Sequence, residues 1–279
     1  MPSEWREAPP GDFAVLGDPV AHSLSPRMQA AAFAARGESY SYRAIRVPLG
    51  EVAEAVAHLR SLGYRGLNVT VPLKAEARAA MGSVDEFAAR CDAVNTIRLK
   101  DLYGINTDGA GFLDTLPVFD QKSALILGAG GSARAIALAL ALDGYNLRIF
   151  NRTTERAVSL VRELCIDAEV VDDPALQDVQ LIVNATSASL HSESIPIAFA
   201  SAAKGALAYD LVYGDTPFLR AARAAGLRTL DGKALLVAQG ARSLEFWLGG
   251  VAPREAMMEA IRGRQSRRRS RISPSPRRP

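Results

Sequence analysis

A glycine-rich segment in the middle of the chain has the spacing of a phosphate-binding turn. The apolar run Ala124–Leu127 leads directly into Gly128-x-Gly130-x-x-Ala133, and a helical pattern then continues to Leu142. Gly128 allows a tight turn, Gly130 lets the backbone approach a pyrophosphate, and Ala133 lets helix and strand pack closely. The free N–H groups and the dipole at the helix start suit a phosphate. We therefore expect a dinucleotide to contact Gly128, Ala129, Gly130, Gly131 and Ser132. The alternative is a strand-to-helix turn that binds no ligand.

The residues after the next apolar run, Leu147–Phe150, indicate which dinucleotide this is. NAD-binding domains usually carry an acidic residue here for the ribose 2′-hydroxyl, whereas this chain has Asn151-Arg152-Thr153-Thr154, followed by Arg156. An acid would repel a 2′-phosphate, and an arginine fork with a hydroxyl can bind one. The segment favours NADP over NAD, unless Arg152 is simply a surface arginine.

Polar side chains stand at unusual places in the first half of the chain. Ser23 and Ser25 are two residues apart, and Asn68 and Thr70 repeat this spacing within an apolar run. In an extended segment such pairs point the same way, so their polar groups would share one pocket. Taken singly, some could be caps: Ser25 is a good helix N-cap, and Asp108 could cap a helix. Further polar residues follow apolar runs: Lys74, Asn95-Thr96 and Asn106-Thr107-Asp108. Together they are what a site for a polyhydroxy carboxylate needs.

Composition excludes several classes of protein. Of the 279 residues 48% are hydrophobic and 23% charged, as in ordinary globular proteins. We expect no membrane span and no secretory signal, and therefore a cytoplasmic protein. The two cysteines and three histidines have no metal-ligand spacing, so we expect no metal site.

The positive charge of the chain is concentrated at its end. Residues 264–279 contain seven arginines and no acid, which leaves 26 basic against 30 acidic residues elsewhere. This Arg/Ser/Pro-rich tail cannot bury apolar area, and we expect it to be disordered. A solvated extension is favoured over a contact with nucleic acid or a membrane surface.

Alternation of strand-like and helical patterns predicts an α/β fold. Strands are expected at 13–16, 40–47, 66–72, 93–99, 124–127, 147–150, 181–183 and 206–209, and helices at 26–36, 51–62, 75–81, from the glycine turn to 142, from 239 to 247 and at 255–262. The second half begins near Asp108, and its strand, glycine turn, helix and next strand have the order of a doubly wound Rossmann-like domain.

Several segments together resemble the shikimate dehydrogenase family, in order and approximate spacing from about residue 12 to 262. They are Gly17-Asp18-Pro19-Val20-Ala21-His22-Ser23-Leu24-Ser25-Pro26, Asn68-Val69-Thr70-Val71-Pro72-Leu73-Lys74, Ala93-Val94-Asn95-Thr96, Asn106-Thr107-Asp108-Gly109, Gly128-Ala129-Gly130-Gly131, Asn151-Arg152-Thr153, Asn184-Ala185-Thr186-Ser187, and Asp231-Gly232 leading to Leu236-Val237-Ala238-Gln239.

The resemblance implies an N-terminal α/β substrate-binding catalytic domain (1–108, joined by C-terminal helices in 238–263), a Rossmann-like NADP domain (109–237) and an active site in the cleft between them. It implies an NADP-dependent enzyme of the aromatic amino-acid precursor pathway that reduces 3-dehydroshikimate to shikimate reversibly, as a monomer or homodimer. It implies that Lys74 is the acid/base, paired with Asp108, and that Ser23 and Ser25 hold the substrate carboxylate. The other implied substrate residues are Asn68, Thr70, Asn95, Tyr213 and Gln239. The implied cofactor residues beyond the glycine turn are Asn151, Arg152, Thr153, Arg156, Thr186, Leu211 and Gly232.

Three positions depart from the family pattern, and two other functions compete with it. Asp92, Ser189 and Ala234 stand where the family usually has glycine, and the last two lie in loops expected near the nicotinamide. A quinate/shikimate dehydrogenase shares the fold and the Lys–Asp pair, and one ring hydroxyl is hard to exclude by sequence. Other NADP domains, such as that of glutamyl-tRNA reductases, share only the second half. A non-catalytic NADP-binding protein whose tail contacts nucleic acid is a further alternative.

Overall fold

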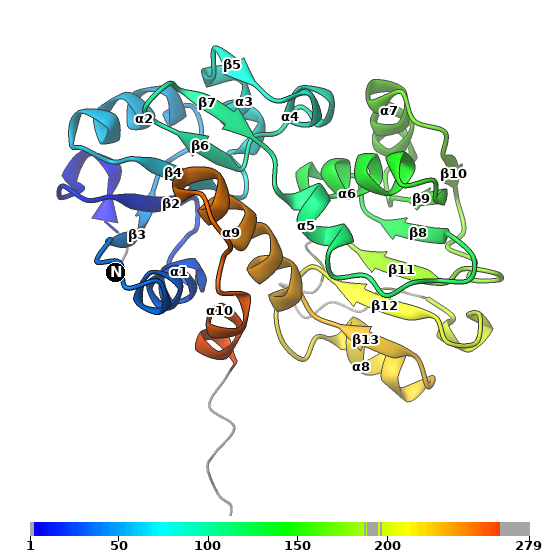
Figure 1. The fold of residues 1–279 in the computed structure, drawn as a ribbon. Helices are drawn as coiled ribbons and strands as arrows, with labels where there is room; N and C mark the ends of the chain where they lie inside the picture. The colour runs from blue at the N-terminus through cyan, green and yellow to red at the C-terminus, as the bar shows by residue number, and fades with distance from the viewer. Residues whose placement is uncertain (1–2, 187, 189–194, 196, 263–279) are drawn as a thin grey trace, which may run out of the picture.

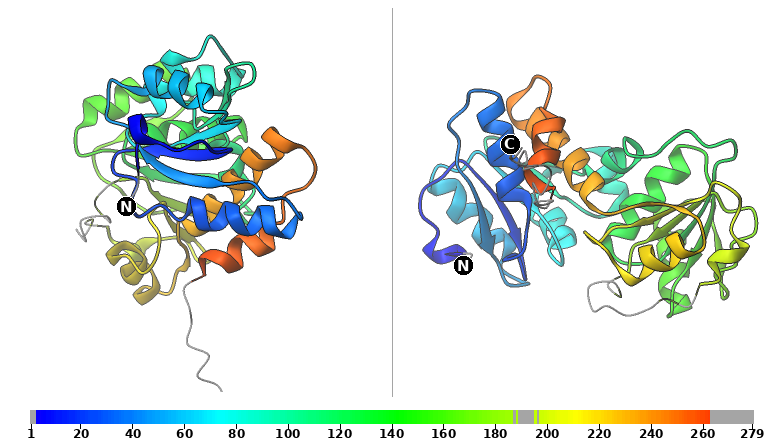
Figure 2. Two further views of the ribbon diagram at one scale, coloured as in Figure 1. Left: turned by 90° about the vertical axis from the view of Figure 1, so that its left-hand side faces the viewer. Right: turned by 90° about the horizontal axis from the view of Figure 1, so that it is seen from below.

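Two lobes, each built on its own β-sheet, make up the protein. The computed structural model describes residues 3–186, 188, 195 and 197–262. Figure 1 shows the two sheets apart from each other, and the view from below in Figure 2 shows the lobes side by side. The predictions for Ser189 and for the tail 264–279 lie outside the described residues.

The strands are short and alternate with helices along much of the chain. The strands are β1 Ser3–Glu4, β2 Phe13–Gly17, β3 Tyr42–Arg46, β4 Gly66–Val69, β5 Ser83–Val84, β6 Thr96–Arg98, β7 Tyr103–Ile105, β8 Ser123–Leu127, β9 Asn146–Phe150, β10 Glu169–Val171, β11 Leu181–Asn184, β12 Leu207–Asp210 and β13 Arg228–Leu230. The helices are α1 Ser25–Ala35, α2 Val52–Ser61, α3 Lys74–Ala80, α4 Glu86–Cys91, α5 Asp108–Leu113, α6 Gly131–Leu142, α7 Thr154–Leu164, α8 Pro217–Ala224, α9 Lys233–Leu248 and α10 Arg254–Ile261, with 3₁₀ turns η1 Trp5–Glu7 and η3 Phe199–Ser201.

The sheet of the first lobe has the order β1-β3-β2-β4-β6-β7-β5. Only β6 runs against the others described, because it pairs antiparallel with both β4 and β7. Strand β2 is buried along its whole length since apolar layers cover both faces of the sheet. Alternate side chains point to opposite faces. Ala14 and Leu16 therefore join one apolar cluster, and Phe13 joins another that includes residues of α1, α9 and α10.

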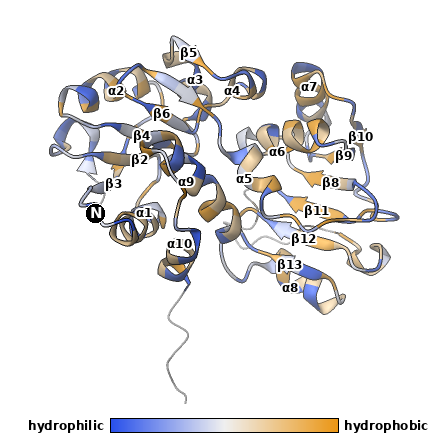
Figure 3. Ribbon diagram, viewed as in Figure 1, coloured by the Kyte–Doolittle hydropathy of each residue, from blue (hydrophilic) through white to orange (hydrophobic). Residues whose placement is uncertain are grey.

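The sheet of the second lobe is parallel throughout the described strands, in the order β10-β9-β8-β11-β12-β13. Along β8, Ala124 and Ile126 belong to one cluster, and Leu125 and Leu127 belong to the cluster on the other face. Figure 3 colours β8 and β11 as hydrophobic, which fits strands covered on both sides. The chain winds outward in both directions from β8 and β11. Ligands of such sheets bind beyond the strand ends at this reversal, which is where the glycine turn begins.

Helices α5 and α9 join the two lobes and pack closely on each other (Figure 1). Gly111 of α5 lies so near that a Cβ there would be 2.8 Å from the backbone nitrogen of Gln239. Asp114, at the end of α5, accepts two hydrogen bonds from Arg242 of α9, at 2.9 and 2.8 Å. The expected domain limits at 108/109 and 237/238 fall within α5 and α9, so both helices run through the junction.

The structure corrects several element boundaries. The strand expected at 93–99 covers only Thr96–Arg98 and forms a hairpin with β7, which was not predicted. Helix α9 begins at Lys233, six residues before the expected start at Gln239. Among the described residues, none of the helices is long and apolar enough to span a bilayer.

Ser25 does not cap a helix, contrary to one reading of the sequence. It is the first residue of α1, the N-cap position is Leu24, and no side chain caps the end. Leu24 has helical dihedral angles, so the Ser23–Ser25 segment is not extended as the spacing argument assumed. The Ser23 hydroxyl accepts a hydrogen bond from the Ser25 amide at 3.2 Å, and both residues still line one pocket. Asp108 likewise is the first residue of α5 rather than its N-cap.

The backbone explains one of the three departures from the family pattern. Asp92 ends α4 with φ 50° and ψ 43°, the left-handed conformation that favours glycine. Asp tolerates this region better than most residues do, but a Cβ still costs energy there. Ala234 is the second residue of α9, where alanine is a good helix former.

We expect Asp92→Gly to raise the free energy of unfolding by about 0.5–1 kcal/mol, because it removes the Cβ from a left-handed residue. Asp92→Ala is the matched control and should lower it, since alanine keeps the Cβ and lacks the polar group that helps aspartate in this conformation. Urea unfolding of wild type, Asp92→Gly and Asp92→Ala measures the three free energies of unfolding. If alanine were as stable as glycine at this position, backbone strain would not be the cause.

Candidate active site

A lysine and a carboxylate form a buried ion pair between the lobes. Lys74 begins α3 directly after β4, and Asp108 begins α5 directly after β7. The Lys74 Nζ atom lies 2.5 Å from Asp108 Oδ2, and the two side chains are 12% and 8% exposed. The two residues are 34 positions apart in sequence. The ends of two strands of the same sheet bring the ammonium and the carboxylate together.

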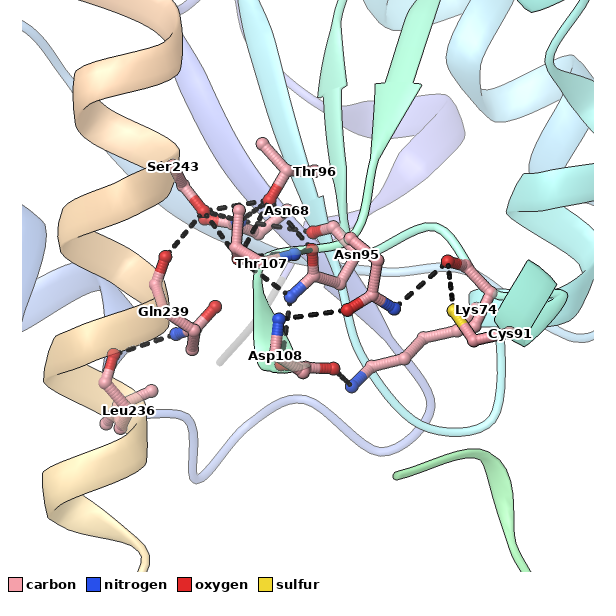
Figure 4. A network of polar contacts seen from close by, with 12 residues as sticks. Asn68, Lys74, Cys91, Asn95, Thr96, Thr107, Asp108, Leu236, Gln239 and Ser243 are labelled. Atoms are coloured by element: carbon pink, nitrogen blue, oxygen red, sulfur yellow. Dashed lines mark hydrogen bonds and ion pairs between the residues drawn. The ribbon is translucent and has the colours of Figure 1, made fainter. Parts of the chain in front are cut away.

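The Asp108 carboxylate is held from two sides (Figure 4). Asn95 Nδ2 donates to Asp108 Oδ1 at 2.9 Å, which leaves Oδ2 for Lys74. The Asp108 amide donates to Asn106 Oδ1 at 2.9 Å, and the Thr107 amide donates to Asn95 Oδ1 at 2.8 Å. The amide of Asn95 is therefore fixed at both ends, and the carboxylate has a single orientation.

Behind this pair lies a second hydrogen-bond network, centred on the side-chain amide of Asn68. The donors of this amide are all engaged. Asn68 Nδ2 is within reach of Ser243 Oγ at 2.9 Å, Thr96 Oγ1 at 3.1 Å and the Asn95 carbonyl at 3.1 Å. Asn68 Oδ1 accepts a hydrogen bond from the Tyr42 hydroxyl at 2.7 Å. Burial raises the pKa of Tyr42 well above its usual value, so this hydroxyl stays protonated and can donate. Asn68 lines the pocket as well, and its expected contact with substrate stays a prediction beside these hydrogen bonds to the protein.

A pocket of about 120 Å³ opens in front of the ion pair. Its walls combine both lobes, since Lys74 and Asp108 face Ser132 of α6, Leu211 and Gly232 across it. All of the substrate residues implied by the sequence lie in its lining: Ser23, Ser25, Asn68, Thr70, Asn95, Tyr213 and Gln239. The sequence did not single out the apolar lining residues Val15, Val69, Ile136, Leu235 and Leu236.

Three hydroxyl groups in the lining are available to a ligand. Those of Ser25, Thr70 and Tyr213 make no hydrogen bond to any other described residue. Burial raises the pKa of Tyr213, helped by the nearby Asp108 and Asp231, so its hydroxyl remains a donor. Gln239, by contrast, donates from Nε2 to the Leu236 carbonyl of its own helix at 2.8 Å.

The glycine turn fits a dinucleotide. Gly128 has φ +106°, which a residue with a Cβ rarely adopts, and its neighbour across the turn is Thr186. A Cβ on Gly130 or Gly131 would meet nothing within 4 Å, so packing within the protein does not require these glycines. Helix α6 starts at Gly131 with no side-chain cap, which leaves its first N–H groups open to a phosphate.

The segment after β9 can hold an additional phosphate. Arg152, Thr153 and Arg156 are exposed, and Asn151 Nδ2 donates to the Thr153 carbonyl at 2.8 Å, which shapes the start of α7. The segment follows the strand next to β8, so it lies on the same edge of the sheet as the glycine turn. On the other side, Gly232 packs against the Leu211 carbonyl with no room for a Cβ.

A larger hollow of about 470 Å³ lies between α4, α5, α6 and α9. It is lined by residues such as Phe87, Ala139 and Arg242, and contains neither Lys74 nor Asp108. The smaller pocket is therefore the candidate active site, because it combines the buried ion pair with the glycine-turn side.

Comparison with known proteins identifies the family. Residues 15–97 match the shikimate dehydrogenase substrate-binding domain, 113–198 match shikimate/quinate 5-dehydrogenase, and 235–262 match the shikimate 5′-dehydrogenase C-terminal domain. A shikimate dehydrogenase (NADP(+)) of Moorella thermoacetica is 43% identical over 277 residues, which cover 92% of this chain and 94% of that protein. The chain belongs to the shikimate dehydrogenase family.

Solved structures of shikimate dehydrogenases have the same fold. That of the Aquifex aeolicus enzyme has a TM-score of 0.85 at 34% identity, covering 91% of this chain and 98% of that one. The Thermus thermophilus enzyme, solved in complex with NADP(H) and shikimate, has a TM-score of 0.83 at 38% identity and covers 89% and 97%. The expected fold class and family are thereby confirmed. The roles of individual residues stay predictions.

The sequence reading missed the residues that support the shikimate dehydrogenase site from behind. Ser243 and Tyr42 contact the polar network without lining the pocket. Asn106, which the sequence had grouped with Asp108, has the same supporting position. Ser243 could have been found, because it stands four residues after Gln239 and so shares its helix face.

Replacing Arg152 with glutamine should weaken NADP binding. Loss of a charge-assisted hydrogen bond to the 2′-phosphate costs about 1.5 kcal/mol at an exposed site, so we expect KM for NADP to rise by about tenfold with kcat little changed. KM for NAD should stay the same because NAD has no 2′-phosphate. Arg162→Gln, at the exposed far end of α7, is the matched control. Equal losses for both cofactors would remove Arg152 from 2′-phosphate recognition.

Proposed function

We propose that this protein catalyses the NADPH-dependent reduction of 3-dehydroshikimate to shikimate and the reverse oxidation. The observation that carries the proposal is a single pocket that joins the Lys74–Asp108 pair to the glycine-turn side of the second lobe. Membership of the shikimate dehydrogenase family supports the reaction, and the relatives named above support NADP as the cofactor.

Lys74 would handle the proton of this reaction. When bound, the nicotinamide supplies the hydride for reduction, or accepts it in the oxidation. In the reduction, the substrate carbonyl gains negative charge on its oxygen, and the Lys74 ammonium stabilises that charge and donates a proton to it. Water then restores the proton on Nζ. The oxidation runs these steps in reverse: Nζ first releases a proton to water, and the neutral amine then takes the substrate hydroxyl proton as the C–H hydrogen is transferred as hydride.

Asp108 would keep the lysine in place for this step. Its Oδ2 accepts from Nζ at 2.5 Å, while Asn95 holds the other oxygen. A carboxylate so fixed positions the ammonium, and its charge balances the buried cation. Geometry of this kind contributes to catalysis because the lysine does not need to search for its reactive position.

Hydroxyl and amide groups of the pocket lining would recognise the substrate. Ser23 and Ser25 would bind the carboxylate, with the uncapped start of α1 behind them. Thr70, Tyr213 and Gln239 would bind ring hydroxyls from the opposite walls. Leu211 and Gly232 would line the nicotinamide side, and Arg152 with its neighbours would hold the adenosine phosphate.

Quinate oxidation is the second candidate, because the family model over residues 113–198 covers shikimate and quinate dehydrogenases together. The two ligands differ by a ring hydroxyl, so kcat/KM measured for both with NADP would decide between them. The monomeric or homodimeric state, the cytoplasmic location and the absence of a nucleic-acid partner stay predictions of the sequence.

The direct test follows NADPH formation by absorbance with the purified full chain, NADP and shikimate. We expect turnover with shikimate and NADP, and weaker activity with NAD or quinate. A wild-type protein that forms no NADPH from shikimate or quinate would exclude the proposed activity.

Lys74→Ala should lower kcat by about 10²–10⁴, the usual contribution of general acid–base catalysis. Substrate binding should change far less, because the hydroxyl groups that hold the ligand remain. Lys100→Ala, at an exposed lysine, is the control and should behave as wild type. Near-normal turnover of Lys74→Ala would assign the proton transfer to another group.

A further inference from the structure

A buried glutamine connects α1 and α9, two helices that contribute residues to the pocket lining. Gln29 lies in α1 and its side chain is fully buried, with 0% exposure. Its Nε2 atom donates to the Gly240 carbonyl of α9 at 3.0 Å, across 211 residues of sequence. Its Oε1 atom meets no donor among the described residues.

The two ends of this hydrogen bond lie next to pocket residues. Ser25 precedes Gln29 by four residues, one turn along the same face of α1, and Gln239 directly precedes Gly240. Both Ser25 and Gln239 line the pocket. The Gln29–Gly240 hydrogen bond therefore joins α1 and α9 next to the residues that carry these two pocket side chains.

Packing alone does not require an amide here. Around it, Met28, Ala241 and Leu244 belong to one apolar cluster that already holds α1 against α9. Gly240 has no space for a Cβ because the Met28 side chain occupies it, so the helices are in close contact. Burying an amide with only part of its hydrogen bonds made costs free energy that a methionine of similar length would avoid. Apolar contact is also non-directional and tolerates a small slide or rotation of one helix on the other, whereas a hydrogen bond does not.

We propose that Gln29 is a positioning residue. Its hydrogen bond to Gly240 fixes the position of α1 relative to α9, so that Ser25 and Gln239 can contact the same substrate molecule. This inference rests on the proposed function, because it assigns Gln29 to substrate recognition at that site. It acts through the two pocket residues and touches neither substrate nor cofactor.

The test compares the kinetics and stability of Gln29→Met with those of wild type. We expect KM for shikimate to rise by about fivefold, which corresponds to the loss of one neutral hydrogen bond. We expect kcat and KM for NADP to stay within about twofold, since Lys74, Asp108 and the second lobe are not displaced. The melting temperature should not fall, because the substitution removes a partly unsatisfied buried amide and adds apolar volume. Gln29→Leu provides a second apolar variant should methionine pack poorly.

Met28→Leu is the matched control, because it alters the same α1–α9 contact and leaves the hydrogen bond in place. It should leave KM for shikimate near the wild-type value. The inference is overturned if stable Gln29→Met and Gln29→Leu proteins keep the wild-type KM for shikimate, or if their KM values for shikimate and NADP rise together. It is also overturned if Met28→Leu raises KM for shikimate and leaves KM for NADP unchanged. Loss of the proposed function would be seen differently, as wild-type protein that neither turns over nor binds shikimate.

Discussion

Burial of the Lys74–Asp108 ion pair is the constraint on which the site depends. Two charges taken out of water are stable only when they are paired and when their remaining hydrogen-bonding positions are filled. Asn95 and Asn106 fill those of the Asp108 segment, and each is itself fixed by a neighbour. Strand β6 runs antiparallel to β4 and β7 and so turns the chain back. Strand β7 therefore ends at the same edge of the sheet as β4, and Asp108 lies opposite the start of α3.

The polar residues around the pair divide into two groups with different physical tasks. Asn68, Thr96, Thr107 and Ser243 are buried and hydrogen-bond to one another, so they form a rigid support. Ser25, Thr70 and Tyr213 line the pocket with hydroxyl groups that no described residue engages. A satisfied buried network rigidifies what it holds, whereas unengaged hydroxyls can form new bonds without breaking old ones. The first group therefore gives the second its geometry.

Much of the fold and of the pocket lining could be predicted from the sequence, because strand–helix alternation, a glycine turn and family motifs are local signals. The glycine turn at Gly128 and the Lys74–Asp108 pair are examples. The hairpin of β6 and β7 was missed because its strands are three residues each, too short for a period to show. Tyr42 and Gln29 were missed for another reason: their partners are far along the chain, and only tertiary packing brings them together. The sequence also could not show that the Asn68 amide is hydrogen-bonded within the protein, because its partners Tyr42 and Ser243 are distant in sequence.

The contact of Gly111 with the backbone of Gln239 has a consequence for how the two lobes can be exchanged or moved. The helices that join the lobes meet at Gln239, which lines the pocket, so a movement of α5 would be passed to Gln239 without an intervening side chain to absorb it. A chimera that grafts a foreign cofactor lobe would therefore have to bring α5 and α9 as a matched couple.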